Sequence, residues 1–271
     1  MKSTISIALL SIICHLTMQA QELFVYTEPA SNMPAKSIGA RITHWVMNET
    51  HTQTLNYHAI PELMWGINKN LMVHVEGFFN NNNKNFSAKG AALYAKYRFF
   101  SKDEVYKHCR LATFCRLSTN NNQTHRQEIE TNGYNTGVEI GAIGTQLLHK
   151  LALSSTISYE HAIYNTNKYT VPTNMPNSSA INYSLSVGRL ILPKTYTSYK
   201  QTNINVMLEL LGQSLLSSNK LYVDIAPSVQ LIFNSQTRLD IGYKKELYSN
   251  MLRVSQNGVL VRIEHILFNV L

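Results

Sequence analysis

The stretch that decides the fold is the run from Leu71 to Phe79, which reads LMVHVEGFF. Side chains of a β-strand alternate between two faces. One face of this run is apolar and holds Leu71, Val73, Val75 and Phe79. The other face holds Met72, His74, Glu76 and Phe78. In a soluble sheet protein the apolar face lies inside, whereas in a membrane barrel it faces lipid and the charges face the lumen.

This alternation of apolar and polar residues recurs along the chain, and the sequence predicts no matching set of helices that could cover the apolar faces. Most of the segments exceed the length of ordinary strands, about 5–6 residues, and suit tilted membrane strands of about 9–11. The predicted strands are 36–47, 54–66, 71–79, 87–99, 105–118, 136–147, 150–161, 180–192, 202–211, 221–233, 237–247 and 258–270. The sequence therefore predicts an all-β protein, a closed antiparallel transmembrane β-barrel of about 12 strands over residues 36–271.

The connections between these strands alternate in length. The longer, polar set is 48–53, 80–86, 119–135, 162–179, 212–220 and 248–257, and the shorter set is 67–70, 100–104, 148–149, 193–201 and 234–236. Long outside loops and short periplasmic turns are typical of outer-membrane barrels, and an even strand count places both termini in the periplasm. Aromatic residues near strand ends on the apolar face would form interfacial girdles: Trp45, Trp65, Tyr97, Phe99, Tyr159 and Tyr243.

The N-terminus predicts export. Lys2 supplies a positive charge, residues 5–13 are apolar, and Ala20 is a small residue suited to cleavage. We expect residues 1–20 to be a signal peptide and residues 21–35, which include Pro29 and Pro34, to form an extended periplasmic arm. No later run is long enough for a membrane helix, which leaves a soluble exported domain or a barrel.

Composition excludes several classes of protein. The formal net charge of +8 can indicate nucleic acid or an anionic membrane surface. We exclude nucleic acid because no basic helix and no run of interleaved aromatic residues is present. Cys109 and Cys115 fall in one predicted strand, roughly 20 Å apart, and cannot pair with each other. Without a Gly-rich phosphate loop, the sequence predicts no cofactor.

The N-terminal arm carries a family resemblance. Residues 22–35, ELFVYTEPASNMPA, lead into SIG at 37–39. This start resembles outer-membrane β-barrels of the Bacteroidetes group, and some of these resemble the transporter family named for the MetA pathway of phenol degradation. The resemblance implies passage of small solutes, insertion into outer-membrane lipid of a Gram-negative bacterium, and handling by the barrel assembly machinery. It assigns no residue-level site, and the chain departs from many such barrels by ending in Leu271.

Strand parity predicts which charges face the lumen. An Arg or Lys facing lipid at the bilayer midplane costs about 2–4 kcal/mol, so charges turn inward. The predicted lumen residues, candidates for lining a pore, are Arg41, Glu62, Glu76, Lys96, Arg98, Arg110, Arg116, Glu139, Glu160, Glu209, Asp224, Arg238, Asp240, Lys244, Arg262 and Glu264. Arg189 is the exception, because it shares parity with Leu185 and Val187. Either a bulge shifts its register or its side chain reaches the membrane interface.

The distribution of these charges leaves two interpretations open. The fourth and fifth predicted strands carry Lys96, Arg98, Arg110 and Arg116, and later strands carry Glu139, Glu160, Glu209 and Asp224. A basic wall facing an acidic wall would orient polar solutes in a narrow pore. In the other interpretation, a salt-bridge network plugs the lumen and serves only stability.

Metal binding and catalysis have weaker support. His58 and His74 share the inward face of adjacent predicted strands, close to Glu62 and Glu76, so they could approach one another. Titratable lumen residues are the simpler interpretation, and we predict no metal site. Outer-membrane phospholipases of similar length carry a His-x-Ser pair that this sequence lacks, and we predict no enzyme activity.

Two functions therefore stay open. The first is a narrow channel or transporter for small solutes. The second is a non-conducting structural or interaction barrel that presents loops 119–135 and 162–179 to a partner.

Overall fold

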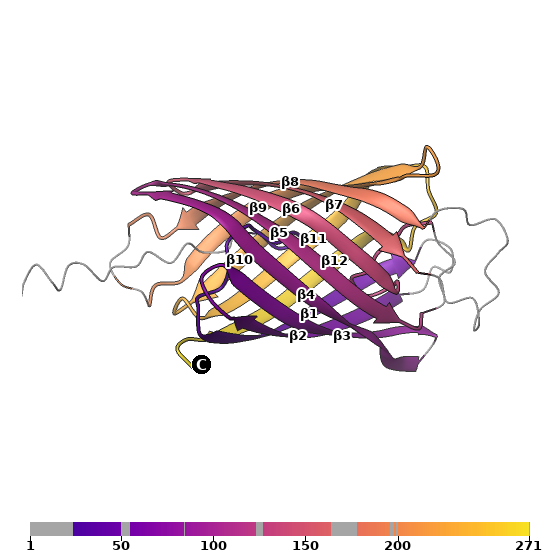
Figure 1. Ribbon diagram of the computed structural model, residues 1–271, viewed down its shortest axis with the longest axis horizontal. Helices are drawn as coiled ribbons and strands as arrows, with labels where there is room; N and C mark the ends of the chain where they lie inside the picture. Colours follow the sequence, from indigo (N-terminus) through magenta and orange to yellow (C-terminus); the bar gives the residue numbers. More distant parts are fainter. Residues whose placement is uncertain are drawn as a thin grey trace, which may run out of the picture.

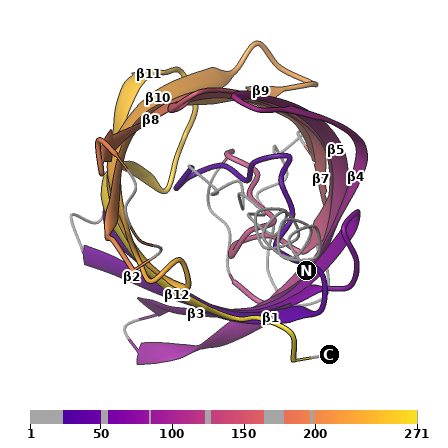
Figure 2. The ribbon, with the colours of Figure 1, turned by 90° about the vertical axis from the view of Figure 1, so that its left-hand side faces the viewer.

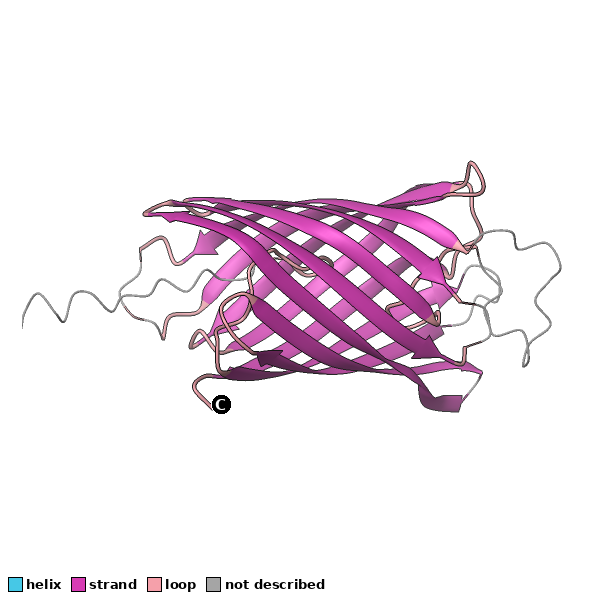
Figure 3. Ribbon diagram, in the orientation of Figure 1, coloured by secondary structure: helices cyan, strands magenta, loops and turns pink. Residues whose placement is uncertain are grey.

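The computed structural model describes residues 24–49, 55–83, 85–122, 127–163, 178–195, 198 and 200–270. Within these residues, twelve antiparallel strands form one closed barrel (Figures 1 and 3). The strands are β1 (Ser37–Glu49), β2 (Leu55–Gly66), β3 (Leu71–Asn83), β4 (Asn85–Glu104), β5 (Lys107–Asn120), β6 (Gly137–Leu148), β7 (Leu151–Ala162), β8 (Ser179–Leu192), β9 (Asn203–Leu215), β10 (Leu221–Phe233), β11 (Thr237–Ser249) and β12 (Ser255–Leu267). The predicted fold class is confirmed.

The barrel closes by pairing its first and last strands. The register of β1 on β12 runs from Ile38↔Leu267 to Glu49↔Ser255, so neither strand is left as an edge. We call the end where β1 begins and β12 finishes the short-turn end, and the opposite end the long-loop end. In the described part of the chain, no helix is long and apolar enough to cross a membrane.

The burial pattern of the strands shows the inverted arrangement that alternation predicts. On β7, Leu153, Ile157 and Tyr159 are exposed by 38–59%. Between them, Ser154, Ser158 and Glu160 are each only 3% exposed. The apolar face therefore points out of the barrel and the polar face points into it, which is the arrangement that lipid requires.

Two hairpins are longer than the sequence indicated. Asn80–Asn83 were expected in a loop, but β3 continues through them, with Asn83 opposite Asn85. β4 continues to Glu104, opposite Lys107, where a turn was expected over 100–104. Polar residues at the end of a strand resemble a loop in the sequence. The alternation of hydrophobic residues ends there, whereas the backbone pairing continues for several more residues.

One predicted girdle residue faces the wrong way. Trp45 shares parity with the buried Arg41 and Thr43, and its ring meets Tyr26 inside the barrel at a centroid distance of 5.4 Å. The expectation that Trp45 faces lipid is therefore wrong. Trp45 was expected on the apolar face near a strand end, but the parity it shares with Arg41 sets an inward direction.

The predicted N-terminal arm lies inside the barrel, where Figure 2 shows it in indigo within the ring of strands. We call residues 24–36 the arm segment. Val25 and Ala30 in it are fully buried. The segment joins β1 at Lys36, whose N–H donates to the carbonyl of Gly66 over 2.7 Å. A Cβ at Gly66 would lie 2.0 Å from the Pro34 carbonyl oxygen, so only glycine allows this passage. The predicted signal peptide, 1–20, lies outside the described residues.

Candidate functional site in the barrel lumen

A single carboxylate of β9 holds the start of the arm segment. Glu209 is fully buried. Its oxygens accept the backbone N–H groups of Val25 at 3.0 Å, Tyr26 at 2.9 Å and Thr27 at 3.0 Å. The Thr27 hydroxyl donates to it at 2.7 Å, and Ser186 of β8 approaches to 3.1 Å. Consecutive backbone N–H groups form a concavity that binds an anion. The carboxylate of Glu209 fills it, so that it satisfies these N–H groups and fixes the position of this turn of the arm.

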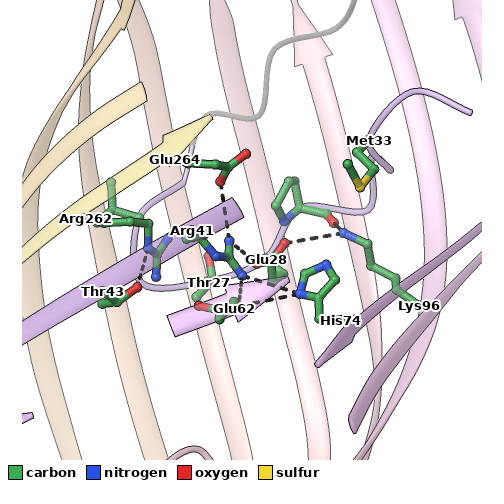
Figure 4. Close-up of polar contacts among 12 residues, drawn as sticks. Thr27, Glu28, Met33, Arg41, Thr43, Glu62, His74, Lys96, Arg262 and Glu264 are labelled. Atoms are coloured by element: carbon green, nitrogen blue, oxygen red, sulfur yellow. Dashed lines mark hydrogen bonds and ion pairs between the residues drawn. The ribbon is translucent and has the colours of Figure 1, made fainter. Parts of the chain in front are cut away.

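A buried guanidinium of β1 links the arm to three strands (Figure 4). Arg41 Nη1 lies 2.9 Å from Glu28 of the arm and 3.8 Å from Glu264 of β12. Its Nη2 lies 2.5 Å from Glu62 of β2. In the β1–β2 register Arg41 is directly opposite Glu62, which explains this contact. Charge-assisted bonds of this kind are stronger than neutral ones, and here they tie the arm to the barrel wall.

The next part of the arm is held by two cations from the opposite wall. Lys96 of β4 is fully buried, and its ammonium donates to the carbonyl oxygens of Pro29 at 2.7 Å and Ser31 at 2.8 Å. It also lies 3.5 Å from Glu28. Arg110 of β5 donates to the Ser31 hydroxyl at 2.9 Å. Both cations were predicted to face the lumen, and what they contact there is the chain's own arm segment.

Apolar packing also holds the arm segment in the lumen. Ala30 and Met33 of the arm join a buried cluster formed by lumen-facing side chains. These are Met64, Met72, Tyr94, Ala112, Phe114, Ile143 and Ile266. The lumen near the short-turn end is therefore not wholly polar, and the arm covers apolar surface that would otherwise meet water.

A second segment enters the lumen from the long-loop end. We call residues 127–136, which lie between β5 and β6, the loop segment. The N–H of Thr131 donates to Glu160 of β7 at 2.5 Å, and the N–H of Ile129 donates to the side-chain oxygen of Gln213 on β9 at 3.0 Å. In Figure 2 a pink segment crosses the interior in addition to the indigo arm. The two ends of the lumen are thus narrowed by different parts of the chain.

Arg253, between β11 and β12, fastens this loop segment. Its guanidinium reaches Asp224 at 2.6 and 2.7 Å, Glu246 at 3.0 Å and Glu128 of the loop segment at 3.2 Å. Burial by itself lowers the pKa of Arg253, but the carboxylates of Glu128 and Asp224 outweigh it and hold that pKa above its ordinary value. The guanidinium therefore stays charged and keeps the two loops together.

Removing this guanidinium should free the loop segment. Arg253→Ala removes the cation that bridges the buried carboxylates of Asp224 and Glu128, and breaking a buried ion pair typically costs about 3–5 kcal/mol. We expect chymotrypsin to cleave at Tyr134 in the folded, membrane-inserted variant and to spare the original protein. Lys245→Ala, which removes an exposed cation from β11, is the control and should stay resistant. Equal resistance of Arg253→Ala would show that other contacts hold the loop.

The predicted lumen carboxylates are all buried in the structure: Glu62, Glu76, Glu139, Glu160, Glu209, Asp224, Asp240 and Glu264. Among the predicted cations, Arg41, Lys96 and Arg238 are buried. The remaining predicted cations are half-buried: Arg98, Arg110, Arg116, Lys244 and Arg262. These side chains lie buried or half-buried, and strand parity gave no information about their partners.

The predicted separation into a basic and an acidic wall is wrong. Arg116 lies directly opposite Glu139 in the β5–β6 register, with Nη1 2.9 Å from its carboxylate, and its Nε lies 3.4 Å from Glu76 of β3. Arg98 lies near the short-turn end, where it donates to the carbonyl of Lys69. Charges of opposite sign therefore alternate around this part of the barrel. The number of the strand that carries a side chain does not indicate where the side chain lies along the barrel axis or how far it extends into the lumen.

The suggested approach of two histidines is also wrong. In the β2–β3 register His58 lies opposite Asn80, and His74 lies opposite Met64. Six strand residues separate these positions, which is roughly 20 Å. His58 instead places Nε2 2.7 Å from the Tyr134 hydroxyl of the loop segment.

Three potential metal ligands do meet in the lumen. Atoms of Glu62, His74 and Glu76 lie within 4.8 Å of one another, and all three residues are buried. However, Arg41 Nη2 lies 2.5 Å from Glu62 and 3.5 Å from His74 Nδ1, and Arg116 holds Glu76. The guanidinium groups already neutralise the carboxylates that a cation would need, and they would repel it. We therefore describe this cluster as an ion-pair network and assign no metal to it.

Solved structures with a similar fold are outer-membrane proteins. The COG4313 outer membrane channel from Pseudomonas putida F1 superposes with a TM-score of 0.60 at 8% identity, covering 90% of this chain and 100% of that one. The NanC porin gives a TM-score of 0.49 at 10% identity, covering 84% and 98%. The KdgM porin gives 0.47 at 10% identity with the same coverage. No family model and no curated protein matches the sequence.

The closed antiparallel barrel, its inverted faces and its charged interior define the class of porin-like outer-membrane β-barrels. At 8% identity the likeness to the Pseudomonas channel is one of fold.

Proposed function

We propose that this protein is an outer-membrane channel for small polar solutes, with a lumen narrowed by its own arm segment. The main support for the proposal is that this segment lies inside a barrel with an apolar outer face, where it contacts charged side chains of the barrel wall. The short-turn end then faces the periplasm and the long-loop end faces the outside. The arm resembles the start of Bacteroidetes outer-membrane barrels, some of which resemble the MetA-pathway transporter family. That resemblance agrees with this proposal and names no solute.

Polar atoms without protein partners support a hydrated lumen. His74 Nε2, Asn205 Oδ1 and Ser228 Oγ are buried inside the barrel and have no hydrogen-bond partner among the residues that the structure describes. Buried polar groups are costly unless they are hydrogen-bonded, and water in the lumen would satisfy them. A plug that served stability alone would be expected to satisfy its own polar groups.

The way the arm is held makes it a restriction that can be removed. In the described part of the chain, the arm segment is joined to a strand at one end, at Lys36 and Ser37. Its polar contacts to Glu209, Arg41 and Lys96 replace hydrogen bonds that the same groups can make with water, so each contributes a modest net free energy. Displacing the arm therefore does not require any strand of the barrel to separate.

Gly242 of β11 offers a way to displace the arm and to test the proposal. A Cβ at Gly242 would lie 2.6 Å from the ring of Tyr26, and its nearest neighbours all belong to that side chain. Gly242→Leu should therefore push the arm off the wall without disturbing the strands. We expect proteoliposomes with this variant to swell several times faster in small sugars than those with the original protein.

The matched control is Gly144→Leu, because Gly144 faces outward and a Cβ there would meet only Leu111, at 3.4 Å. This variant should swell at the original rate. Absence of swelling for the original protein and for Gly242→Leu would contradict the channel and favour the non-conducting, structural barrel.

A further inference from the structure

Arg189 is the one charge that strand parity could not explain, and the structure turns it toward lipid. The β7–β8 register is unbroken from His161↔Ser179 to Leu151↔Arg189. The β8–β9 register shifts only between Leu190 and Leu192, beyond the regular pair Arg189↔Val206, so no bulge rotates the Arg189 side chain inward. Arg189 is exposed, as are Val187 and Ile191 on the same face. The bulge is thus excluded as the reason, and Arg189 reaches the outer surface of the barrel near its short-turn end.

Two lysines converge on the same place from the neighbouring turns. Lys150 lies in the β6–β7 turn, and Lys194 lies in the connection between β8 and β9. Together with Arg189, Leu190 and Ile191, they line a concavity of about 310 Å³. None of the residues that line it is acidic. In the described part of the chain, neither Arg189 nor Lys194 forms an ion pair.

Lys150 holds the shape of this concavity. Its ammonium donates to the backbone carbonyls of Pro193 at 2.9 Å and Lys194 at 2.6 Å. These two bonds fix the start of the β8–β9 connection against the start of β7. An ammonium has three donors, so one stays available to a ligand. The site is therefore built by a specific contact between two turns as well as by the presence of basic residues.

We propose that this concavity binds the phosphate headgroup of an anionic phospholipid, with an acyl chain along Ile191 and Val187. The proposal rests on the outer-membrane location and orientation proposed above, which place the short-turn end at the phospholipid headgroups of the periplasmic leaflet. A guanidinium matches phosphate geometry with two parallel hydrogen bonds, and basic residues at a membrane interface attract anionic lipids. An exposed Arg on an apolar strand face is stabilised by such a partner.

The test uses the full protein reconstituted in vesicles of equal parts phosphatidylcholine and phosphatidylglycerol. The protein is extracted in a mild detergent, and native mass spectrometry identifies the lipids that stay bound to it. We expect the original protein to retain phosphatidylglycerol in preference to phosphatidylcholine. The double variant Arg189→Ala/Lys194→Ala should lower that preference by roughly thirtyfold, because two surface cations are lost. Excess inorganic phosphate should not displace the lipid, because a free ion lacks the acyl chains.

The matched control is Lys102→Ala/Lys107→Ala, which removes the same charge from exposed positions at the same end of the barrel. It should keep the preference. An equal loss in both double variants would overturn the site and leave only general attraction to a basic rim. A folded, inserted protein with no preference would overturn the lipid site alone, whereas failure to insert into vesicles would overturn the membrane proposal as well.

Discussion

Glu209→Ala is expected to release the arm segment from the barrel wall. The change removes the acceptor of three backbone N–H groups and of the Thr27 hydroxyl. Each buried donor left unpaired costs about 1–3 kcal/mol, so the seated position loses more free energy than a single hydrogen bond contributes. Released donors regain partners only by moving into water, which favours the displaced arm.

This release can be measured by labelling. Cys109 and Cys115 are first replaced by Ser, and a reporter cysteine is then introduced by Ala30→Cys. Ala30 is fully buried, so the reporter is shielded from reagents while the arm is in place. We expect Glu209→Ala to raise its rate of reaction with a membrane-impermeant maleimide by at least about tenfold. Ser186→Ala removes one contact to Glu209, at 3.1 Å, and one to the Thr27 hydroxyl, at 3.0 Å. It leaves the acceptor of all three backbone N–H groups in place and should change the rate much less than Glu209→Ala. Identical rates for Glu209→Ala and the original would show that apolar packing alone seats the arm.

Leu185→Arg is expected to damage assembly far more than Ser184→Arg. Leu185 lies in the middle of β8 and is 58% exposed on the outer face, so the new charge would meet the centre of the bilayer. Ser184, its neighbour, points into the lumen, where it is half-buried and a charge can be hydrated. The expected difference is about 2–4 kcal/mol in the free energy of folding into lipid.

Folding yields in lipid vesicles, read from protease resistance after insertion, provide the comparison. Similar yields for the two variants would mean that β8 has the opposite facing or that its outer face does not contact lipid.

Most of the barrel was predictable because lipid imposes one requirement on every strand. Each strand must present apolar side chains outward at every second position, and that pattern is visible in LMVHVEGFF and its counterparts. The twelve strands and their antiparallel order follow from it. The ends of β3 and β4 did not follow, because strands that extend beyond the bilayer no longer need the pattern.

The interior was predictable only in part. Parity placed Arg116 and Glu139 on the lumen face, but their pairing depends on register, which short turns alone did not determine. The arm had no strand pattern and was placed in the periplasm, although Glu28 among apolar residues was a signal that it meets cations. Arg253 lies in a predicted loop, where charged residues are ordinarily solvated, so nothing in the sequence pointed to its buried contacts.

These contacts together describe a barrel whose two mouths are narrowed by independent segments. The arm segment is held by Glu209, Arg41 and Lys96, and the loop segment is held by Glu160 and Arg253. A solute crossing the lumen would meet both. Within the described residues the arm is joined to a strand only at its C-terminal end, which makes it the segment with the greater freedom to leave.

The central claim is that the barrel conducts and that its arm restricts conduction. Single-channel recording of the purified protein in a planar lipid bilayer tests it most directly, with the original chain compared with the double variant Glu209→Ala/Gly242→Leu. We predict discrete conductance steps in both proteins, with larger steps in the double variant because the arm no longer occupies the lumen. A folded, inserted double variant that shows no steps, or steps equal to those of the original, would contradict the claim.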